Sequence, residues 1–336
     1  MRRWLMGLVA LVVATAGTAS SQGQVIVYSS FHDEFIQAWG RPFTAATGIP
    51  VLNIVVSSGE SHSRLRAEAQ RPQANFWLSV RPAILEQAYN EGLIEAWAPV
   101  NAANIQSAYQ YDAPYITAVG TYPLVVFYNP TALARAGLQP PTPDWESLTD
   151  MAYRGQIVMP HPATSGTAYA LITTNLQRFM QAGGSEDDGW MYLARLYANV
   201  AQFTRSGRAP QSMVAQGEYP IGIGFYDAVW QFQQEGFPIE VLVPEPTFSE
   251  PYGAAIVRGG PHPEAAQAFF EFLLTPEGQA VLTDFGNAPI IEGAAALEGG
   301  VTVDPDQVIV VDYSWAADNR DRLLQKYQEL TGAEPQ

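Results

Sequence analysis

Residues 24–82 read QVIVYSSFHDEFIQAWGRPFTAATGIPVLNIVVSSGESHSRLRAEAQRPQANFWLSVRP, and this stretch predicts the fold. Three short β-rich runs, at residues 24–30, 51–56 and 76–80, alternate with helical patterns at residues 33–47 and 57–70. Strands that alternate with helices at this spacing are typical of a parallel sheet with crossover helices. In such sheets, ligands bind at the carboxyl ends of the strands, where the helices begin.

Polar or small residues follow each of these three strands, so we expect them near a ligand. They are Ser29, Ser30 and His32 after the first strand, Ser57, Ser58, Gly59 and Glu60 after the second, and Arg81 after the third. Arg81 could bind a phosphate through its forked guanidinium, or it could be an ordinary surface arginine. His32 could contact a ligand or simply begin a helix.

The rest of the chain repeats the α/β pattern. Further strands are predicted at residues 121–129, 157–159, 221–225, 239–244 and 252–257, and further helices at residues 168–180, 189–201, 228–235, 263–274, 276–285 and 318–330. A chain of 336 residues is longer than one hydrophobic core usually serves. We therefore predict two lobes: residues 24–120 with 245–300, and residues 121–244, followed by a closing segment at 301–336.

The first 22 residues are typical of a secretion signal. Arg2 and Arg3 precede an apolar run from Leu5 to Ala16, and small residues follow at 17–20. The apolar run is shorter than the roughly 20 residues that span a bilayer, although an uncleaved anchor is the alternative. We expect a periplasmic or extracellular protein. The chain has no cysteine, which excludes disulfides, a lipid-bearing cysteine and thiol catalysis.

Charge excludes one class of partner. Without the signal, which carries two arginines and no acid, the chain keeps 15 basic and 33 acidic residues, a net charge of −18. Nucleic acid is an unsuitable partner, because binding it requires a basic surface. An acidic surface mainly promotes solubility, and a few local cations can still hold an anion.

The sequence Ser165-Gly166-Thr167 opens a predicted helix and is the sharpest candidate site. Free amide hydrogens at a helix start, together with two hydroxyls and the helix dipole, form an anion site. The alternative is an ordinary N-cap, in which a hydroxyl satisfies the first helical turn.

Tyr226 and Asp227 end the predicted strand IGIGF and could bind an amine or a sugar hydroxyl, or could instead cap and pack locally. No zinc-protease motif, nucleophile elbow, phosphate-binding Gly-Lys loop or dinucleotide fingerprint is present. We predict neither a catalytic residue nor a cofactor.

Several of these motifs resemble one family in the family's order. VYSSFHDEF, SGESHSRLRAEAQ, YRGQIVMPHPATSGTAY and IGIGFYDAVW are similar to segments of the extracellular solute-binding proteins of ABC importers, in the group for ferric iron, phosphonate and polyamine. The resemblance implies a type 2 periplasmic-binding-protein fold: two α/β lobes, each a mainly parallel sheet flanked by helices, hinged by crossing strands and closing on a ligand. It also implies a monomer whose partner is a membrane permease.

The family's ferric-iron residues are only partly matched. His32 occupies the place of the family's metal-binding histidine, and Tyr226-Asp227 replaces a pair of tyrosines. Val80 and Arg81 stand where the family has a glutamate, and a cation there would repel iron. The anion-binding helix start is matched by Ser165, Gly166 and Thr167. The resemblance therefore implies an anion site of the family with a different cargo.

We predict a solute-binding receptor for a small organic phosphate or phosphonate, such as a hexose phosphate or an aminoalkyl phosphonate. Ser165, Gly166 and Thr167 would hold the anion, with Ser58, Gly59 and Arg81 closing over it. The organic part would meet Tyr226, Asp227, Ser30 and His32. The alternatives are ferric iron bound by His32, Tyr226 and Asp227 with a synergistic anion, a polyamine or thiamine-like cation, and a secreted phosphate-ester hydrolase.

Overall fold

The computed structural model describes residues 23–56, 58–111, 113, 115–294, 301 and 303–334. The predicted signal at residues 1–22 lies outside this range, as do Ser57 and residues 295–300 of the predicted first lobe. Within the described part, no helix is long and apolar enough to cross a membrane.

The structure is an α/β fold, as predicted. Its strands are β1 (Val25–Ser29), β2 (Val51–Val55), β3 (Phe76–Val80), β4 (Thr117–Tyr128), β5 (Ile157–Pro160), β6 (Val200–Thr204), β7 (Ile221–Phe225), β8 (Glu240–Leu242) and β9 (Ser249–Ile256). Its α-helices are α1 (Asp33–Thr47), α2 (Ser58–Ala67), α3 (Pro82–Asn90), α4 (Pro130–Ala136), α5 (Gly166–Gln181), α6 (Glu186–Tyr197), α7 (Ala209–Ala215), α8 (Tyr226–Gln234), α9 (Pro263–Leu273), α10 (Pro276–Thr283), α11 (Tyr313–Asp318) and α12 (Arg320–Thr331).

The strands lie in the order β2-β1-β3-β9-β4-β7-β5-β6, and β8 also pairs with β4. β1, β2 and β3 are parallel to one another, and so are β5, β6 and β7. Between these two parallel groups run the antiparallel strands β4 and β9.

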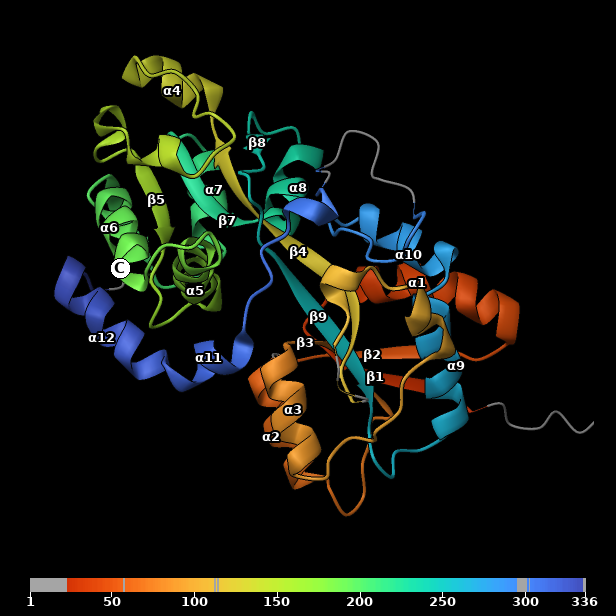
Figure 1. Cartoon of the computed structure of the whole chain (residues 1–336). Coiled ribbons are helices and arrows are strands. Elements are labelled where there is room, and N and C mark those ends of the chain that lie inside the picture. Colours follow the sequence, from red (N-terminus) through yellow and green to blue (C-terminus); the bar gives the residue numbers. More distant parts are fainter. Residues whose placement is uncertain are drawn as a thin grey trace, which may run out of the picture.

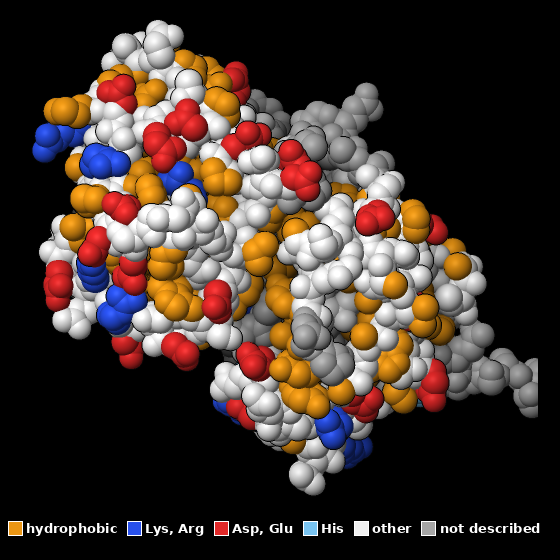
Figure 2. All heavy atoms as spheres, in the orientation of Figure 1, with side chains coloured by type: hydrophobic (Ala, Val, Ile, Leu, Met, Phe, Trp, Pro, Cys, Tyr) orange, Lys and Arg blue, Asp and Glu red, His pale blue; other side chains and the backbone are white. Residues whose placement is uncertain are grey.

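β4 joins the two halves of the molecule. Its residues 117–123 pair with β9, whereas residues 124–128 pair with β7. Figure 1 shows β4 and β9 running diagonally from one half to the other. The lobe boundary predicted after residue 120 therefore falls inside a continuous strand. On the face shown in Figure 2, the surface is hollowed between the halves.

Local sequence explains several element ends. Helix α1 has Asp33 and Glu34 in its first turn, where acids favour the helix dipole, and ends at Gly48 in the left-handed conformation. Helix α6 begins with a capping box in which Ser185 and Asp188 satisfy each other's backbone amides. This start, together with β6, corrects the predicted helix at residues 189–201: the helix ends at Tyr197 and a strand begins at Val200.

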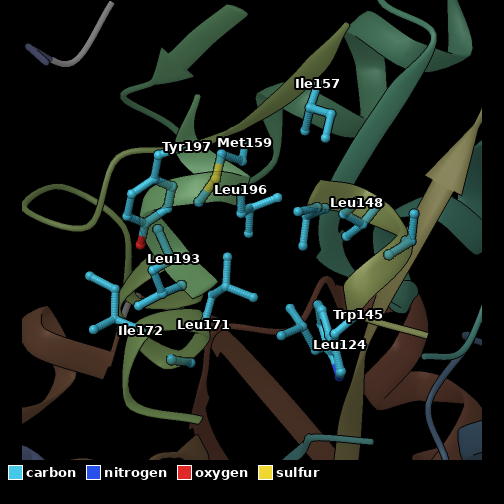
Figure 3. Close-up of a cluster of buried hydrophobic side chains, with 14 of the residues drawn as sticks. Leu124, Trp145, Leu148, Ile157, Met159, Leu171, Ile172, Leu193, Leu196 and Tyr197 are labelled. Carbon is cyan, nitrogen blue, oxygen red and sulfur yellow. The ribbon is translucent and has the colours of Figure 1, made fainter. Parts of the chain in front are cut away.

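Each half has its own core. In the second half, α5 and α6 pack on the sheet through buried side chains that include Trp145, Leu171, Leu193 and Leu196 (Figure 3). In the first half, the aromatic residues Trp39, Phe76 and Phe269 dominate a cluster between α1, α9 and the sheet. Separate cores allow the two halves to move as units about β4 and β9.

The C-terminal segment crosses from one half to the other. Helix α12 packs against α6 of the second half, and α11 contacts α3 of the first half. Figure 1 shows α11 lying between α12 and α3. The segment thus bridges the two halves on one side of the cleft.

Candidate functional site

A cavity of about 310 Å³ lies between the two halves, where β4 and β9 run from one half to the other. Both halves contribute to its wall. The charged residues and aliphatic hydroxyls that line it are Ser30, Arg81, Thr167, Arg208, Asp227 and Glu250.

The start of helix α5 faces this cavity through Thr167. Ser165 is the N-cap residue, with extended backbone, but its side chain makes no capping hydrogen bond. The helical ladder begins where the Tyr169 amide donates to the Ser165 carbonyl over 3.2 Å, so the amide hydrogens of residues 166–168 precede it. The ordinary N-cap interpretation of Ser165 is therefore not supported.

Gly207 brings a turn of the chain onto this helix start. A Cβ atom at Gly207 would lie 2.8 Å from the Ser165 hydroxyl oxygen and 3.1 Å from that of Thr167. A side chain at this position would displace the two hydroxyls. The turn at residues 205–208 and the start of α5 consequently form one wall.

Arg81 extends from the first half to the start of α5. It is the N-cap residue of α3, directly after β3, and its guanidinium lies so close to Gly166 that a methyl group there would overlap it. Its Nε atom lies 3.1 Å from Oε1 of Glu250. A guanidinium from one half is thus held at the positive end of a helix from the other half.

Glu250 lies on β9, and its side chain is only 7% exposed. Burial raises the pKa of its carboxyl group, and Arg81 acts in the opposite direction. Glu250 is not among the residues predicted from the sequence. The available signal was an acid within the apolar run at residues 248–257, because an acid in a buried strand needs a partner.

Asp227 and Arg208 form the second ion pair of the cavity, with 3.2 Å between Asp227 Oδ2 and Arg208 Nη2. Loss of water around Asp227 raises its pKa, while Arg208, the amide hydrogens of Ala228 and Asp227, and the charge of His32 oppose that shift. Asp227 stands in the first turn of α8, not at the end of the preceding strand.

Arg208 is also absent from the sequence prediction. Because the predicted helix at residues 189–201 covers the start of β6, the turn that follows this strand is not recognised as a strand end. The buried amide of Gln211 fixes that turn: with its nitrogen facing the turn, it donates to the carbonyls of Gly207 and Arg208 over 3.3 and 3.0 Å.

Aromatic rings form the remaining wall. The Tyr122 ring centroid lies 4.6 Å from that of Tyr252 and 5.8 Å from that of Phe225, and all three residues line the cavity. The Tyr252 hydroxyl points away toward Gly120 and Leu282, so this residue offers mainly its ring. Such faces pack against the carbon skeleton of a ligand, while the charged groups fix its orientation.

The other predicted residues have different positions. Ser30 lines the cavity, and exposed His32 begins α1 within electrostatic reach of Asp227. The Ser29 hydroxyl donates instead to Oδ1 of Asn53 over 2.9 Å. Exposed Glu60 is not part of the cavity lining.

Ser57 lies outside the described residues. Ser58 and Gly59 begin helix α2, and for these two residues the structure describes only the backbone.

The placement of Tyr226 does not support the predicted role in ligand binding. The side chain is buried, and its hydroxyl donates to Oε1 of Gln233 over 3.3 Å and bonds to the backbone of Val301. Burial raises the pKa of Tyr226 to about 12. The phenol points into the apolar packing beneath α8 because Tyr226 begins that helix and is not the last residue of β7.

The alternative of a ferric-iron site requires the Tyr226 oxygen beside His32 and Asp227. Because that oxygen bonds to Gln233 beneath α8, it is not placed to be an iron ligand. Within the described part of the chain, no three His, Asp or Glu side chains are grouped so that they could hold a metal ion. The cavity instead presents two guanidinium groups and a helix start, which are groups that bind anions.

Comparison with known proteins agrees with this fold. A family model described as bacterial extracellular solute-binding protein matches residues 38–307. A Salmonella typhimurium protein described as a 2-aminoethylphosphonate-binding periplasmic protein is 24% identical over 290 residues, covering 83% of this chain and 82% of the relative.

Two solved structures share the fold. The periplasmic binding protein AfuA from Actinobacillus pleuropneumoniae, solved with fructose-6-phosphate, is 27% identical with a TM-score of 0.73, and the match covers 93% of this chain and 99% of AfuA. The ferric iron-binding protein A of Mannheimia haemolytica has the same TM-score of 0.73 at 18% identity, covering 92% of this chain and 98% of the other. The second likeness concerns the fold alone.

Proposed function

Because the chain belongs to the bacterial extracellular solute-binding protein family, we propose that it captures a small organic phosphate or phosphonate outside the cytoplasm. It acts as a monomer and passes this solute to the membrane permease of an ABC importer. Binding alone is its activity, and no covalent step is involved. The observation that carries the proposal is the Arg81 guanidinium beside Gly166, at the start of α5.

The phosphoryl or phosphonyl group occupies the space between Arg81, Arg208 and Thr167. The amide hydrogens at the start of α5 and the two guanidinium groups carry positive charge, and each guanidinium keeps N–H donors that its carboxylate partner does not use. An anion with three oxygen atoms accepts hydrogen bonds from each group. Because each half supplies one of the two arginines, the anion would lie between the halves.

The organic part of the solute lies toward Asp227 and Glu250. Each carboxylate uses one oxygen for its arginine and keeps further lone pairs for a hydroxyl or ammonium group. The ring faces of Tyr122, Phe225 and Tyr252 cover the carbon skeleton. A hexose phosphate and an aminoalkyl phosphonate both fit this division. AfuA with its bound fructose-6-phosphate, and the description of the Salmonella relative as a 2-aminoethylphosphonate-binding protein, support it.

Closure of the two halves completes the site. Arg81 belongs to the first half and Gly166 to the second, so the full set of anion-binding groups exists only when these residues meet. Motion about β4 and β9 separates them and releases the solute. The solute therefore stabilises the closed arrangement by the difference between its affinities for the closed and the open arrangement.

Isothermal titration calorimetry tests the proposal on the mature protein after denaturation, dialysis and refolding have removed any bound solute. Fructose 6-phosphate, 2-aminoethylphosphonate and inorganic phosphate are titrated separately. We expect one of the organic compounds to bind at least tenfold more tightly than inorganic phosphate. Arg208→Gln should weaken this binding about 10- to 100-fold, because a charge-assisted hydrogen bond contributes about 1.5–3 kcal/mol.

Arg205→Gln is the matched control, since Arg205 is exposed on the same turn and does not line the cavity. Equal losses in the two variants would refute the assignment of Arg208 to the anion. Absence of heat with either organic compound, together with tight ferric binding and a visible tyrosinate absorption band, would overturn the proposed solute class.

A further inference from the structure

A second cavity, of about 530 Å³, lies beside the first. One of its walls is formed by Glu86 of α3 and the described residues 108–111, 113, 115 and 116, and another by residues 308–314 and 317 of the C-terminal segment. Pro251 of β9 lines both cavities. The second cavity therefore lies where the C-terminal segment bridges the two halves.

The chemistry of this cavity is opposite to that of the first. Its described lining contains no lysine, arginine or histidine. It contains aromatic rings and carboxylates, which are Tyr109, Tyr111, Tyr115, Tyr313, Glu86 and Asp312. Both acids are exposed at the rim. Tyrosine rings present negative faces, so rings and carboxylates together favour a cation.

The charges of Glu250 and Arg81, which lie outside the lining, add little to the preference of this cavity for a cation. Glu250 stands close enough to Tyr111 and Tyr313 to disfavour ionisation of their hydroxyls, and Arg81 acts on Tyr313 in the opposite sense. Because Arg81 is paired with Glu250, these two charges largely cancel at the second cavity. The acids at the rim remain unopposed within the lining.

The floor of the cavity holds a buried hydroxyl with spare hydrogen-bonding capacity. Ser249 is 2% exposed and lines the cavity, and its hydroxyl has no partner at ideal hydrogen-bonding geometry. Its neighbour is the Tyr109 hydroxyl, which it shares with buried Thr121. A polar occupant of the cavity would satisfy the capacity left on Ser249.

We propose that this second cavity binds a small organic ammonium ion that also carries a hydroxyl group. The ammonium group lies against the rings of Tyr111, Tyr115 and Tyr313 near the carboxylates of Glu86 and Asp312. The hydroxyl reaches Ser249 on the floor. This site is separate from the anion cavity and does not depend on the identity of the solute bound there.

The position of the site links its occupancy to closure. The hydroxyls of Tyr111 and Tyr313 hydrogen-bond to each other, so the loop of the first half and α11 are joined at the cavity wall. An ion held between these walls contacts both. By linkage, the ion and the solute of the first cavity then increase each other's affinity by the same factor.

Choline is the probe, and 3,3-dimethylbutan-1-ol is its uncharged counterpart of the same shape. Both are titrated into the refolded full mature chain, followed by calorimetry and by two-dimensional NMR of ¹⁵N-labelled protein. We expect choline to bind and to shift amide signals of residues 109–116 and 308–317, while the alcohol binds at least tenfold more weakly. Glu86→Gln combined with Asp312→Asn should weaken choline binding about tenfold.

Asparagine at position 312 preserves the cap that this residue provides to the Trp315 amide. The matched control is Glu264→Gln with Glu277→Gln, which removes two exposed acids from α9 and α10 and leaves the cavity lining unchanged. Equal binding of choline and the alcohol would overturn the proposal. So would equal affinities in the two double variants, or choline shifts confined to other residues.

Discussion

The first cavity contains two arginine–carboxylate pairs of the same chemistry that differ in burial. The Glu250 side chain is 7% exposed and its partner Arg81 43%, whereas Asp227 is 24% exposed and Arg208 56%. Glu250 also lies on a strand that joins the two halves, while Arg208 lies on a turn.

Because of this difference in burial, we expect the two ion pairs to have different roles. A buried carboxylate cannot lose its partner without cost, so Glu250 fixes Arg81 in one place over the start of α5. Arg208 is more exposed to water and is free to adjust to the anion that we propose it binds. One pair therefore sets the geometry of the closed site, and the other adapts to the solute.

Gly166→Val should have the largest effect, because it acts on the fixed pair. The new side chain would displace the Arg81 guanidinium from the start of α5. We expect solute affinity to fall about 100-fold, about 3 kcal/mol. Calorimetry of this variant, of Arg81→Gln and of the double variant completes the measurement.

If the valine acts through Arg81, the double variant should bind the solute with the same affinity as the single variant of lower affinity. Additive losses would show that Gly166 matters for another reason, such as direct contact with the anion. That result would weaken the distinction between the fixed and the adaptable arginine.

Arg81→Gln should destabilise the unliganded protein by about 2 kcal/mol. Removing one partner of a buried pair leaves an uncompensated charge, although the partial exposure of Arg81 reduces the cost below the 3–5 kcal/mol of a fully buried pair. Arg208→Gln should cost less than about 1 kcal/mol, because its pair is more exposed. Urea denaturation at pH 7 measures both.

Adding Glu250→Gln to Arg81→Gln should recover most of the lost stability, since no buried charge then remains. If Arg208→Gln is as destabilising as Arg81→Gln, burial does not distinguish the two pairs.

The pH dependence of Glu250→Gln should be the smallest effect. Burial raises the pKa of Glu250 above its usual value of 4.5, so the folded protein binds this proton more tightly than the unfolded chain does. The stability contribution of Glu250 is greatest at low pH and falls as pH rises above about 4.5. The difference in unfolding free energy between Glu250→Gln and the unchanged protein should therefore shift in favour of the variant from pH 4.5 to pH 7.

Asp227→Asn should shift in the same direction, because loss of water also raises the pKa of Asp227. If Glu250→Gln instead loses relative stability over this pH range, Arg81 outweighs burial at Glu250.

Much of the fold follows from local sequence. The alternation of strands and helices in residues 24–82 predicts β1, α1, β2 and β3 within one or two residues, since periodicity and helix-end chemistry act over short distances. The second half is predicted less well. β6 is missed because its residues continue the apolar pattern of α6, and Tyr226 is assigned to β7 because the helix signal begins only after it.

The anion site shows the same division. Ser165-Gly166-Thr167 is identifiable because a helix start with small residues is a local feature. Arg81 is recognised as a candidate from its place after a strand. Arg208, which completes one pair, gives no comparable signal. Glu250, which completes the other, is an acid within an apolar run, and this pattern indicates that it needs a partner but not which residue it faces.

The sequence by itself determined the two-part α/β class, most of its elements and the helix start with small residues, because each rests on neighbouring residues. Only the tertiary structure decided which charges meet: Arg81 with Glu250 and Gly166, and Arg208 with Asp227. Those contacts join residues far apart in the chain, and only the packing of two cores about two crossing strands brings them to one cavity.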